Sequence, residues 1–197
     1  MKSFDFDTVK QLMAHRRSIK PVDMDASKEV SKELIAELAE CANWAPSHGL
    51  TEPLRLHVFY GENREEFAKN LQNTYKAETP EAEFKPEKFE KMGNNVMFSH
   101  SIMAIVMKRG NNPKIPVIEE VQAVACAIQN MHLAASALGL GLYWSSPPVS
   151  YGEGFKKFLE LGEEDQCLGF LFVGWPKDEF EWPGSRRKPA AEKLVWC

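Results

Sequence analysis

The spacing of hydrophobic and polar positions predicts that the first part of the chain alternates helices with a strand. Apolar residues recur at helical spacing over residues 7–15, and again in a helix that begins at Ser31, a good N-cap, and ends at Pro46. Residues 55–60 are rich in strand-forming side chains, and a helical pattern resumes over residues 62–75. These elements follow one another without a linker rich in glycine, proline or serine.

The middle of the chain combines a charged excursion with strongly apolar elements. Residues 76–95 contain prolines and many charges, and we expect an exposed excursion with short helical pieces there. Residues 101–107 form a continuous apolar run, which is typical of a strand buried on both faces. Residues 118–138 form the strongest helical pattern, with apolar side chains on nearly every side, so we expect this helix in the core.

The last part of the chain adds two strands, at residues 140–144 and 168–173, with a polar helical piece at 152–161. The strands are too few and too irregularly spaced for a doubly wound sheet, and no repeat divides the chain. We therefore expect a single domain over residues 1–197 with an α+β layered fold.

Composition and charge narrow the class of protein. The apolar fraction of 44% and charged fraction of 26% are typical of a soluble protein. Neither a membrane-spanning stretch nor a signal peptide is apparent, so we expect a cytoplasmic protein that binds no membrane. A net charge of -4 argues against nucleic-acid binding, which needs a basic surface. An anionic ligand would therefore need a local basic pocket.

Several kinds of site are excluded by spacing. The four cysteines and five histidines show no metal-ligand pattern, so no metal site is expected. Cys41 and Cys126 lie in apolar helical segments and are expected to pack in the core, and His132 is expected to be a buried histidine with its hydrogen bonds satisfied. Gly139 follows a helix and precedes a strand, which favours a helix C-cap over a dinucleotide-binding loop.

What remains is a set of short polar and aromatic clusters spread along the chain. Together they offer guanidinium groups for a phosphate, hydroxyls and backbone donors for a polar chain, and aromatic surface for a flat ring, as a phosphorylated flavin needs. The clusters are Arg16-Arg17-Ser18, Trp44-Ala45-Pro46-Ser47-His48-Gly49 with Pro53, Tyr143-Trp144-Ser145-Ser146-Pro147, and Ser185-Arg186-Arg187-Lys188-Pro189.

In order and spacing, these blocks resemble the FMN-dependent nitroreductase family. The matching blocks are RRSIKP, WAPSHG with Pro53, AIQNMHLAASALGLGLYW, GFLFVGWP and SRRKP before a hydrophobic tail. The resemblance implies a three-layer α+β fold with a central, mostly antiparallel sheet packed between helices. It also implies a homodimer with two FMN molecules at the subunit interface and a C-terminal arm, about residues 185–197, that reaches over the partner.

The resemblance also assigns cofactor-binding residues. The first cluster and the late arginines would hold the phosphate and the ring edge, the loop after Pro46 would contact the flavin of the partner subunit, and the cluster after Tyr143 would lie beside the ring. Simpler interpretations stay open: a solvated helix end for the first cluster, a turn for His48, core packing for Trp144 and a solvated charge run for the late arginines. The residues assigned to the cofactor are Arg16, Arg17, Ser18, His48, Leu50, Trp144, Ser145, Ser146, Arg186 and Arg187.

The expected activity is that of an FMN-dependent oxidoreductase. Electrons would pass from NADH or NADPH to an electron-poor small molecule, such as a nitroaromatic or a quinone, by a ping-pong mechanism on flavin N5 with no catalytic side chain. Other flavin chemistry on the same scaffold, such as dehalogenation or flavin breakdown, and non-catalytic flavin binding are the alternatives. The sequence departs from the family pattern at Leu50-Thr51-Glu52 and at Leu54, which leaves the substrate open.

Overall fold

A computed structural model describes residues 3–184 and 187–197 of the protein. The described residues form a five-stranded sheet in which β1 (Met24–Asp25), β5 (Gln166–Pro176), β3 (Ser101–Met107) and β2 (Leu54–Tyr60) follow one another in this order. The remaining strand, β4 (Gly141–Ser145), also pairs with β5. Every strand pair is antiparallel, which confirms the α+β fold and the antiparallel sheet.

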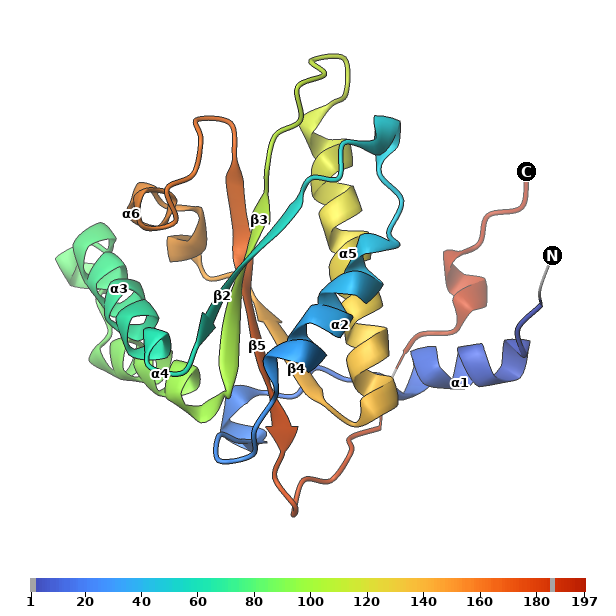
Figure 1. Ribbon diagram of the computed structural model, residues 1–197, viewed down its shortest axis with the longest axis horizontal. Coiled ribbons are helices and arrows are strands. Elements are labelled where there is room, and N and C mark those ends of the chain that lie inside the picture. The colour runs from blue at the N-terminus through green and yellow to red at the C-terminus, as the bar shows by residue number, and fades with distance from the viewer. Residues whose placement is uncertain (1–2, 185–186) are drawn as a thin grey trace.

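Helices cover both faces of this sheet (Figure 1). On one face, α2 (Lys32–Asn43) packs against α5 (Val117–Leu138), while α3 (Asn63–Glu78), α4 (Pro86–Phe98) and α6 (Glu153–Phe158) cover the other. Because both faces are covered, all seven residues of β3 are buried, as the continuous apolar run predicts. The core is accordingly split into two apolar clusters, one on each side of the sheet.

The helix boundaries follow capping chemistry that is visible in the sequence. Ser31 caps α2, because its hydroxyl accepts a hydrogen bond from the N–H of Leu34 at 3.1 Å. Gly139 ends α5 in the left-handed conformation at φ 76°, where its N–H bonds the carbonyls of Ala135 and Ser136. Both predicted caps are confirmed, and Gly139 takes no part in a dinucleotide loop.

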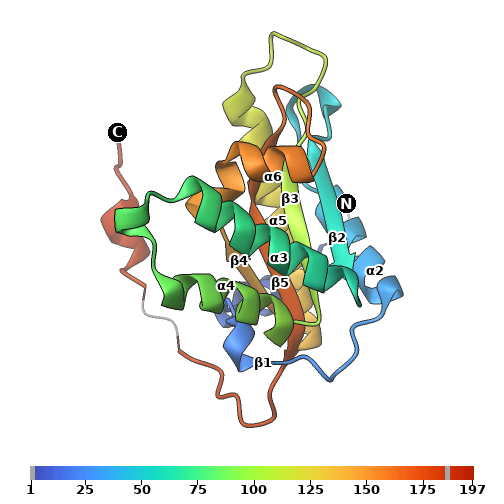
Figure 2. The ribbon, with the colours of Figure 1, turned by 90° about the vertical axis from the view of Figure 1, so that its left-hand side faces the viewer.

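The expectation of an exposed excursion with short helical pieces at residues 76–95 is confirmed for exposure, since most of these residues are exposed, but the helical pieces are longer than expected. Helix α3 continues to Glu78, and α4 is a 13-residue helix that packs along α3 (Figure 2). Pro86 occupies the first turn of α4, where proline costs no hydrogen bond, and Met92 and Val96 are buried on the inner face. The prolines mark the ends of two helices rather than an irregular segment.

Helix α5 is only partly a core helix. His132 and the apolar side chains of its inner face are buried, but Ile118 and Leu138 are exposed. The expectation that Cys126 packs in the core is also wrong, since its side chain is exposed, and Cys41 on α2 is half-buried. A stripe of α5 therefore remains uncovered in a single copy of the chain.

Two terminal segments lie away from the sheet. Helix α1 (Phe6–His15) has no buried residue and presents Phe6, Val9 and Met13 to solvent. The C-terminal segment, with a short 3-10 turn at Ala190–Lys193, extends on the same side of the molecule as α1 (Figure 1). Within the described residues, no helix has both the length and the apolar character needed to cross a membrane.

Candidate functional site

The basic cluster lies where α1 ends and meets the edge of the sheet. Arg16 caps α1, with its N–H on the carbonyl of Leu12. Ser18 then forms a parallel bridge to Leu142 of β4, and the N–H of Ile19 donates to the Leu142 carbonyl at 3.1 Å. The start of the basic cluster is thus brought beside β4, although more than a hundred residues separate them in the sequence.

Positive charge gathers around Arg16. Partial burial and the nearby Arg17 and Arg187 guanidinium groups lower the pKa of Arg16. Among the described residues, no carboxylate or other acceptor binds its guanidinium. Clustered arginines that repel one another without a counter-charge fit a bound phosphate, which would accept hydrogen bonds from several of them.

The neighbouring Arg17 has a different setting. Its guanidinium donates to the carbonyls of Pro183 at 2.7 Å, Ala14 at 2.6 Å and Arg16 at 2.7 Å. These bonds satisfy the C-terminal end of α1 and tie it to the segment that leads to the C-terminus. Arg17 therefore holds the cluster in shape, while Arg16 is the arginine with an open guanidinium.

Two buried polar side chains of α5 lie in the same region. The Nδ1 atom of His132 and the hydroxyl of Ser136, one helical turn later, are buried and have no hydrogen-bond partner among the described residues. Burial lowers the pKa of His132 to about 4, and the Arg16 charge adds to the effect. The expectation that His132 is a satisfied core histidine is therefore wrong: it is buried but unsatisfied, and neither residue was singled out as a candidate from the sequence. Orphaned polar atoms beside a cluster of positive charge fit a polar ligand.

The strand β4 continues the site away from Ser18. The indole N–H of Trp144 donates to the Leu168 carbonyl at 3.0 Å, so its polar atom serves the packing of β4 against β5. Ser145 lines a cavity of about 330 Å³ on the face covered by α3 and α4, and Ser146 is exposed beyond it. That cavity is also lined by Tyr143, Phe170, Lys88, Lys91 and Asn95.

Sequence reasoning missed the side chains that α4 contributes to this cavity. Lys88, Lys91 and Asn95 recur at helical spacing, and this spacing could have indicated that they share one face of a helix. The nearby prolines suggested an irregular segment instead.

Arg187 is exposed and close enough to act on Arg16, whereas Arg186 lies outside the described residues. Among the described residues, no group of three or more potential ligands is suited to a metal ion.

The predicted loop residues His48 and Leu50 lie elsewhere on the same chain. His48 contacts Glu119 in the first turn of α5, whereas Arg16 lies near His132 toward the other end of that helix. At about 1.5 Å per residue, Glu119 and His132 are about 20 Å apart along the axis. A single chain therefore does not bring His48 and Leu50 to the arginine cluster.

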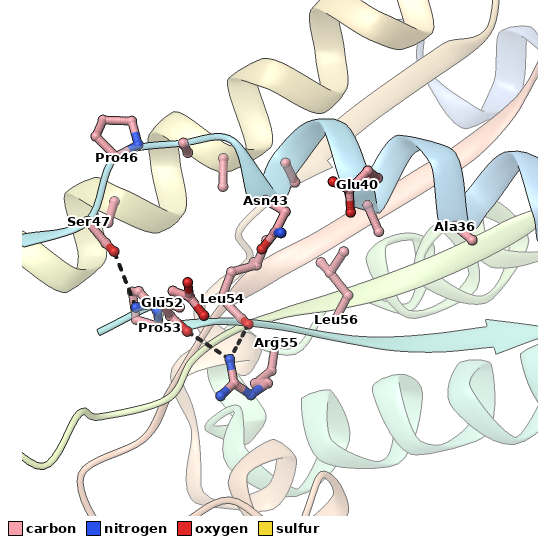
Figure 3. A pocket seen from close by; sticks show the side chains of 15 residues that line it. Ala36, Glu40, Asn43, Pro46, Ser47, Glu52, Pro53, Leu54, Arg55 and Leu56 are labelled. Carbon is pink, nitrogen blue, oxygen red and sulfur yellow. Dashed lines mark hydrogen bonds between the residues drawn. The ribbon is translucent and has the colours of Figure 1, made fainter. Parts of the chain in front are cut away.

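Behind this loop lies a larger cavity of about 410 Å³ between α2, α5 and the start of β2 (Figure 3). Small side chains of α2 and α5 form its floor, and Ser47, Glu52 and Arg55 stand at its rim. The Ser47 hydroxyl accepts the N–H of Glu52 at 3.3 Å, and Arg55 donates to the carbonyls of Glu52 and Leu54. This cavity holds no group of unsatisfied polar atoms comparable to that beside Arg16 among the described residues.

Comparison with known proteins shows which family this chain belongs to. The model of the nitroreductase family matches residues 13–175, which include the basic cluster, the loop after Pro46, strands β1 to β4 and all but the last residue of β5. The chain belongs to the nitroreductase family. The resemblance of the motifs and the match of the family model agree.

Individual relatives of this nitroreductase family member are distant. YdjA of Escherichia coli K12, named as a candidate NAD(P)H nitroreductase, is 27% identical over 167 residues, 85% of this chain and 87% of its own length. A nitroreductase-like protein of Bacillus cereus has a TM-score of 0.78 at 25% identity, covering 100% of this chain and 98% of its own. A candidate nitroreductase of Desulfovibrio desulfuricans, solved in complex with FMN, has a TM-score of 0.69 at 24% identity, covering 98% of both chains.

Proposed function

We propose that this nitroreductase family member is an FMN-dependent oxidoreductase that passes electrons from NADH or NADPH to an electron-poor acceptor such as a nitroaromatic or a quinone. The observation that carries the proposal is the cluster of Arg16 with its neighbouring arginines and the unsatisfied His132 and Ser136. The chain has a net negative charge, yet these arginines and the unpartnered polar atoms of α5 lie close together, beside the edge of the sheet. A phosphate-bearing cofactor would satisfy both.

Each part of the site has a separate task in this proposal. The Arg16 guanidinium, assisted by Arg187, binds the phosphate, and Ser18 and the buried polar atoms of α5 offer further hydrogen bonds. Arg17 fixes the backbone from which Arg16 extends. FMN held by these residues would supply two-electron redox chemistry between a nicotinamide donor and an electron-poor acceptor.

We also propose that the active protein is a homodimer. His48 and Leu50 are far from Arg16 within one chain, so a site that includes both needs a second copy. The C-terminal segment and α1 support this, because each exposes large apolar side chains that a monomer leaves in water. The loop of one copy would then lie over the cofactor bound to the arginine cluster of the other.

The cofactor can be tested by absorbance of the purified protein. A flavin peak at about 450 nm is expected, and anaerobic NADH or NADPH should bleach it, since the cofactor rather than a side chain carries the electrons. Arg16→Ala should retain FMN at least about tenfold less tightly, as expected when a charge-assisted hydrogen bond is lost. Arg64→Ala is the matched control, because Arg64 donates to the backbone carbonyls of Gly61 and Ser99, away from both the cluster and the His48 loop.

Different outcomes test different parts of the proposal. A protein that binds no FMN, even when FMN is added, contradicts it entirely. A yellow protein that is not bleached by either nicotinamide supports a non-catalytic flavin-binding role. Equal FMN affinity in Arg16→Ala and Arg64→Ala would remove Arg16 from the phosphate site.

A further inference from the structure

The end of α1 that carries the basic cluster is not placed by burial of the helix itself. None of the residues of α1 is buried, and the helix lies away from the sheet (Figure 1). Arg16 nevertheless extends from its C-terminal end, beside the buried polar atoms of α5. The contacts that hold this end in place come from the opposite end of the chain.

Two consecutive residues of the segment that follows β5 bind this helix end. The indole of Trp182 stacks on the imidazole of His15, with the ring centroids 4.6 Å apart and the planes 4° from parallel. The indole N–H also donates to the His15 carbonyl at 2.6 Å. The carbonyl of the next residue, Pro183, accepts a hydrogen bond from Arg17 Nε at 2.7 Å. Both sequence neighbours of Arg16 are therefore held by this one segment.

Trp182 is in turn anchored to the body of the molecule. Its half-buried ring meets the ring of Phe180 edge-on, at 5.9 Å between centroids. Both rings pack against the apolar core on the side of the sheet that α3 and α4 cover. Arg187 follows in the same segment, and its charge acts on Arg16. The segment that holds the end of α1 thus also supplies a second guanidinium to the cluster.

The placement of the guanidinium groups matters because the C-terminal end of a helix does not attract an anion. The carbonyls there carry partial negative charge, in contrast to the N–H groups of a helix N-terminus. Arg17 donates to the carbonyls of Ala14 and Arg16. The Trp182 indole covers the carbonyl of His15 between them. A phosphate beside this end therefore depends on guanidinium groups that are held in the right place, since charge-assisted hydrogen bonds require good geometry.

We propose that Trp182 is a positioning residue for the phosphate site, because it fixes the end of α1, and with it Arg16, against the segment that carries Arg187. This rests on the proposed function, in which the ligand of the cluster is the phosphate of FMN. Trp182 does not touch that ligand and acts through His15 and the backbone next to Arg16. It lies between the GFLFVGWP and SRRKP blocks of the sequence, so the order of the motifs does not identify it.

Two flavins that differ only in the phosphate separate positioning from general damage to the fold. Full-length protein freed of flavin by dialysis is titrated with FMN and with riboflavin, and flavin fluorescence gives both dissociation constants. The wild type should bind FMN at least about tenfold more tightly than riboflavin, the effect of one or more charge-assisted hydrogen bonds. Trp182→Ala should raise the Kd of FMN about tenfold and leave that of riboflavin unchanged, because only the phosphate contacts are displaced.

Further variants test the stacked ring itself. In Trp182→Phe a ring can still stack on His15, and water can replace the indole N–H at the carbonyl, so the Kd of FMN should stay close to the wild-type value. His15→Ala removes the same stack from the helix side and should add little to Trp182→Ala. Trp175→Ala is the matched control, since the half-buried Trp175 indole also donates to a backbone carbonyl, that of Glu29. It should leave the preference for FMN over riboflavin unchanged.

Several results would overturn the inference. An equal loss of FMN and riboflavin affinity in Trp182→Ala would show that the residue only supports the fold. Additive effects of Trp182→Ala and His15→Ala would also contradict it, as would a Trp182→Phe variant that binds FMN as weakly as Trp182→Ala. A wild type that binds FMN no better than riboflavin contradicts the proposed phosphate site as well. A wild-type preference for FMN that survives Trp182→Ala contradicts this inference alone.

Discussion

At the scale of single residues, His132 is a buried polar side chain whose unpartnered nitrogen lowers the stability of the protein but leaves a hydrogen-bonding group for a ligand. The ring is buried, its Nδ1 has no partner among the described residues, and the positive charge of Arg16 lies nearby. A protonated imidazole in this position would add charge to a region that is already positive. His132 is therefore neutral near pH 7, and the positive charge of the arginine cluster is available to bind an anion.

This arrangement predicts a loss of stability in acid. The pKa of His132 falls from 6.5 to about 4 on folding, so between these pH values the imidazole is protonated in the unfolded chain and neutral in the folded chain. The contribution of His132 to stability is complete above about pH 6.5 and declines as the pH falls toward 4, by about 2 kcal/mol between pH 7.5 and 5. Urea unfolding at both pH values measures it.

The contribution of His132 can be isolated by substitution. His132→Leu cannot take up a proton, so its free energy of unfolding should fall by about 2 kcal/mol less than that of the wild type over the same pH interval. All other titrating groups are common to both proteins and cancel in the difference. The same decline in wild type and variant would show that His132 is not kept neutral by its surroundings.

At the scale of secondary structure, the first turn of α5 combines two neighbouring acids with different tasks. From the sequence, Glu119 and Glu120 are equivalent first-turn acids that interact favourably with the helix dipole. In the fold, Glu120 is buried with Arg109, and Glu119 faces the exposed loop. The two residues should therefore differ in their effect on stability.

Glu120→Ala should destabilise the protein by about 3 kcal/mol or more, because it leaves Arg109 largely buried without its counter-charge. Glu119→Ala is the matched control and should cost about 1 kcal/mol or less. Glu120→Gln keeps an acceptor for the Gly110 N–H and should fall between them. Thermal unfolding of the three variants gives the order. Equal melting temperatures for Glu119→Ala and Glu120→Ala would contradict a structural role for the buried pair.

Elements of this fold could be predicted where local chemistry and period agree. The cap at Ser31, the C-cap at Gly139 and the buried run of β3 follow directly from the sequence. Only short helical pieces were expected where α4 lies, because Pro86 suggests a break, although the first turn of a helix tolerates proline. The two-residue strand β1 was missed as well, because its pairing with β5 depends on a distant segment.

The candidate site was predictable only in part, for the same physical reason. The order of the motifs identifies Arg16 and Ser18 as candidate cofactor-binding residues. It does not show which arginine is free to bind a ligand, because that depends on the backbone carbonyls that Arg17 bonds in the folded chain. Likewise, the polar atoms of His132 and Ser136 can be recognised as buried and without partners only in the folded chain. Sequence supplies the residue types, and tertiary contacts decide which of them remain free for a ligand.

At the scale of the whole molecule, much of the exposed apolar surface lies on α1, on the outer side of α5 and on the C-terminal segment. α1 and the C-terminal segment extend on the same side (Figure 1). The outer stripe of α5 is exposed as well. Val195 and Trp196 are 86% and 89% exposed. Together with the exposed apolar side chains of α1, they form apolar surface that a second copy could cover, which favours the proposed dimer.

Replacement of Val195 and Trp196 by serine should therefore weaken the dimer. Loss of two buried apolar side chains, at about 1.5 kcal/mol or more each, should raise the dissociation constant at least about a hundredfold. Light scattering after gel filtration across a dilution series measures it, and Val58→Ser is the matched control because Val58 is exposed on β2. FMN affinity should fall together with dimer content, since in the proposed dimer the His48 loop and the arginine cluster come from different copies. A wild-type protein that stays monomeric while it binds FMN would contradict both the dimer and the shared site.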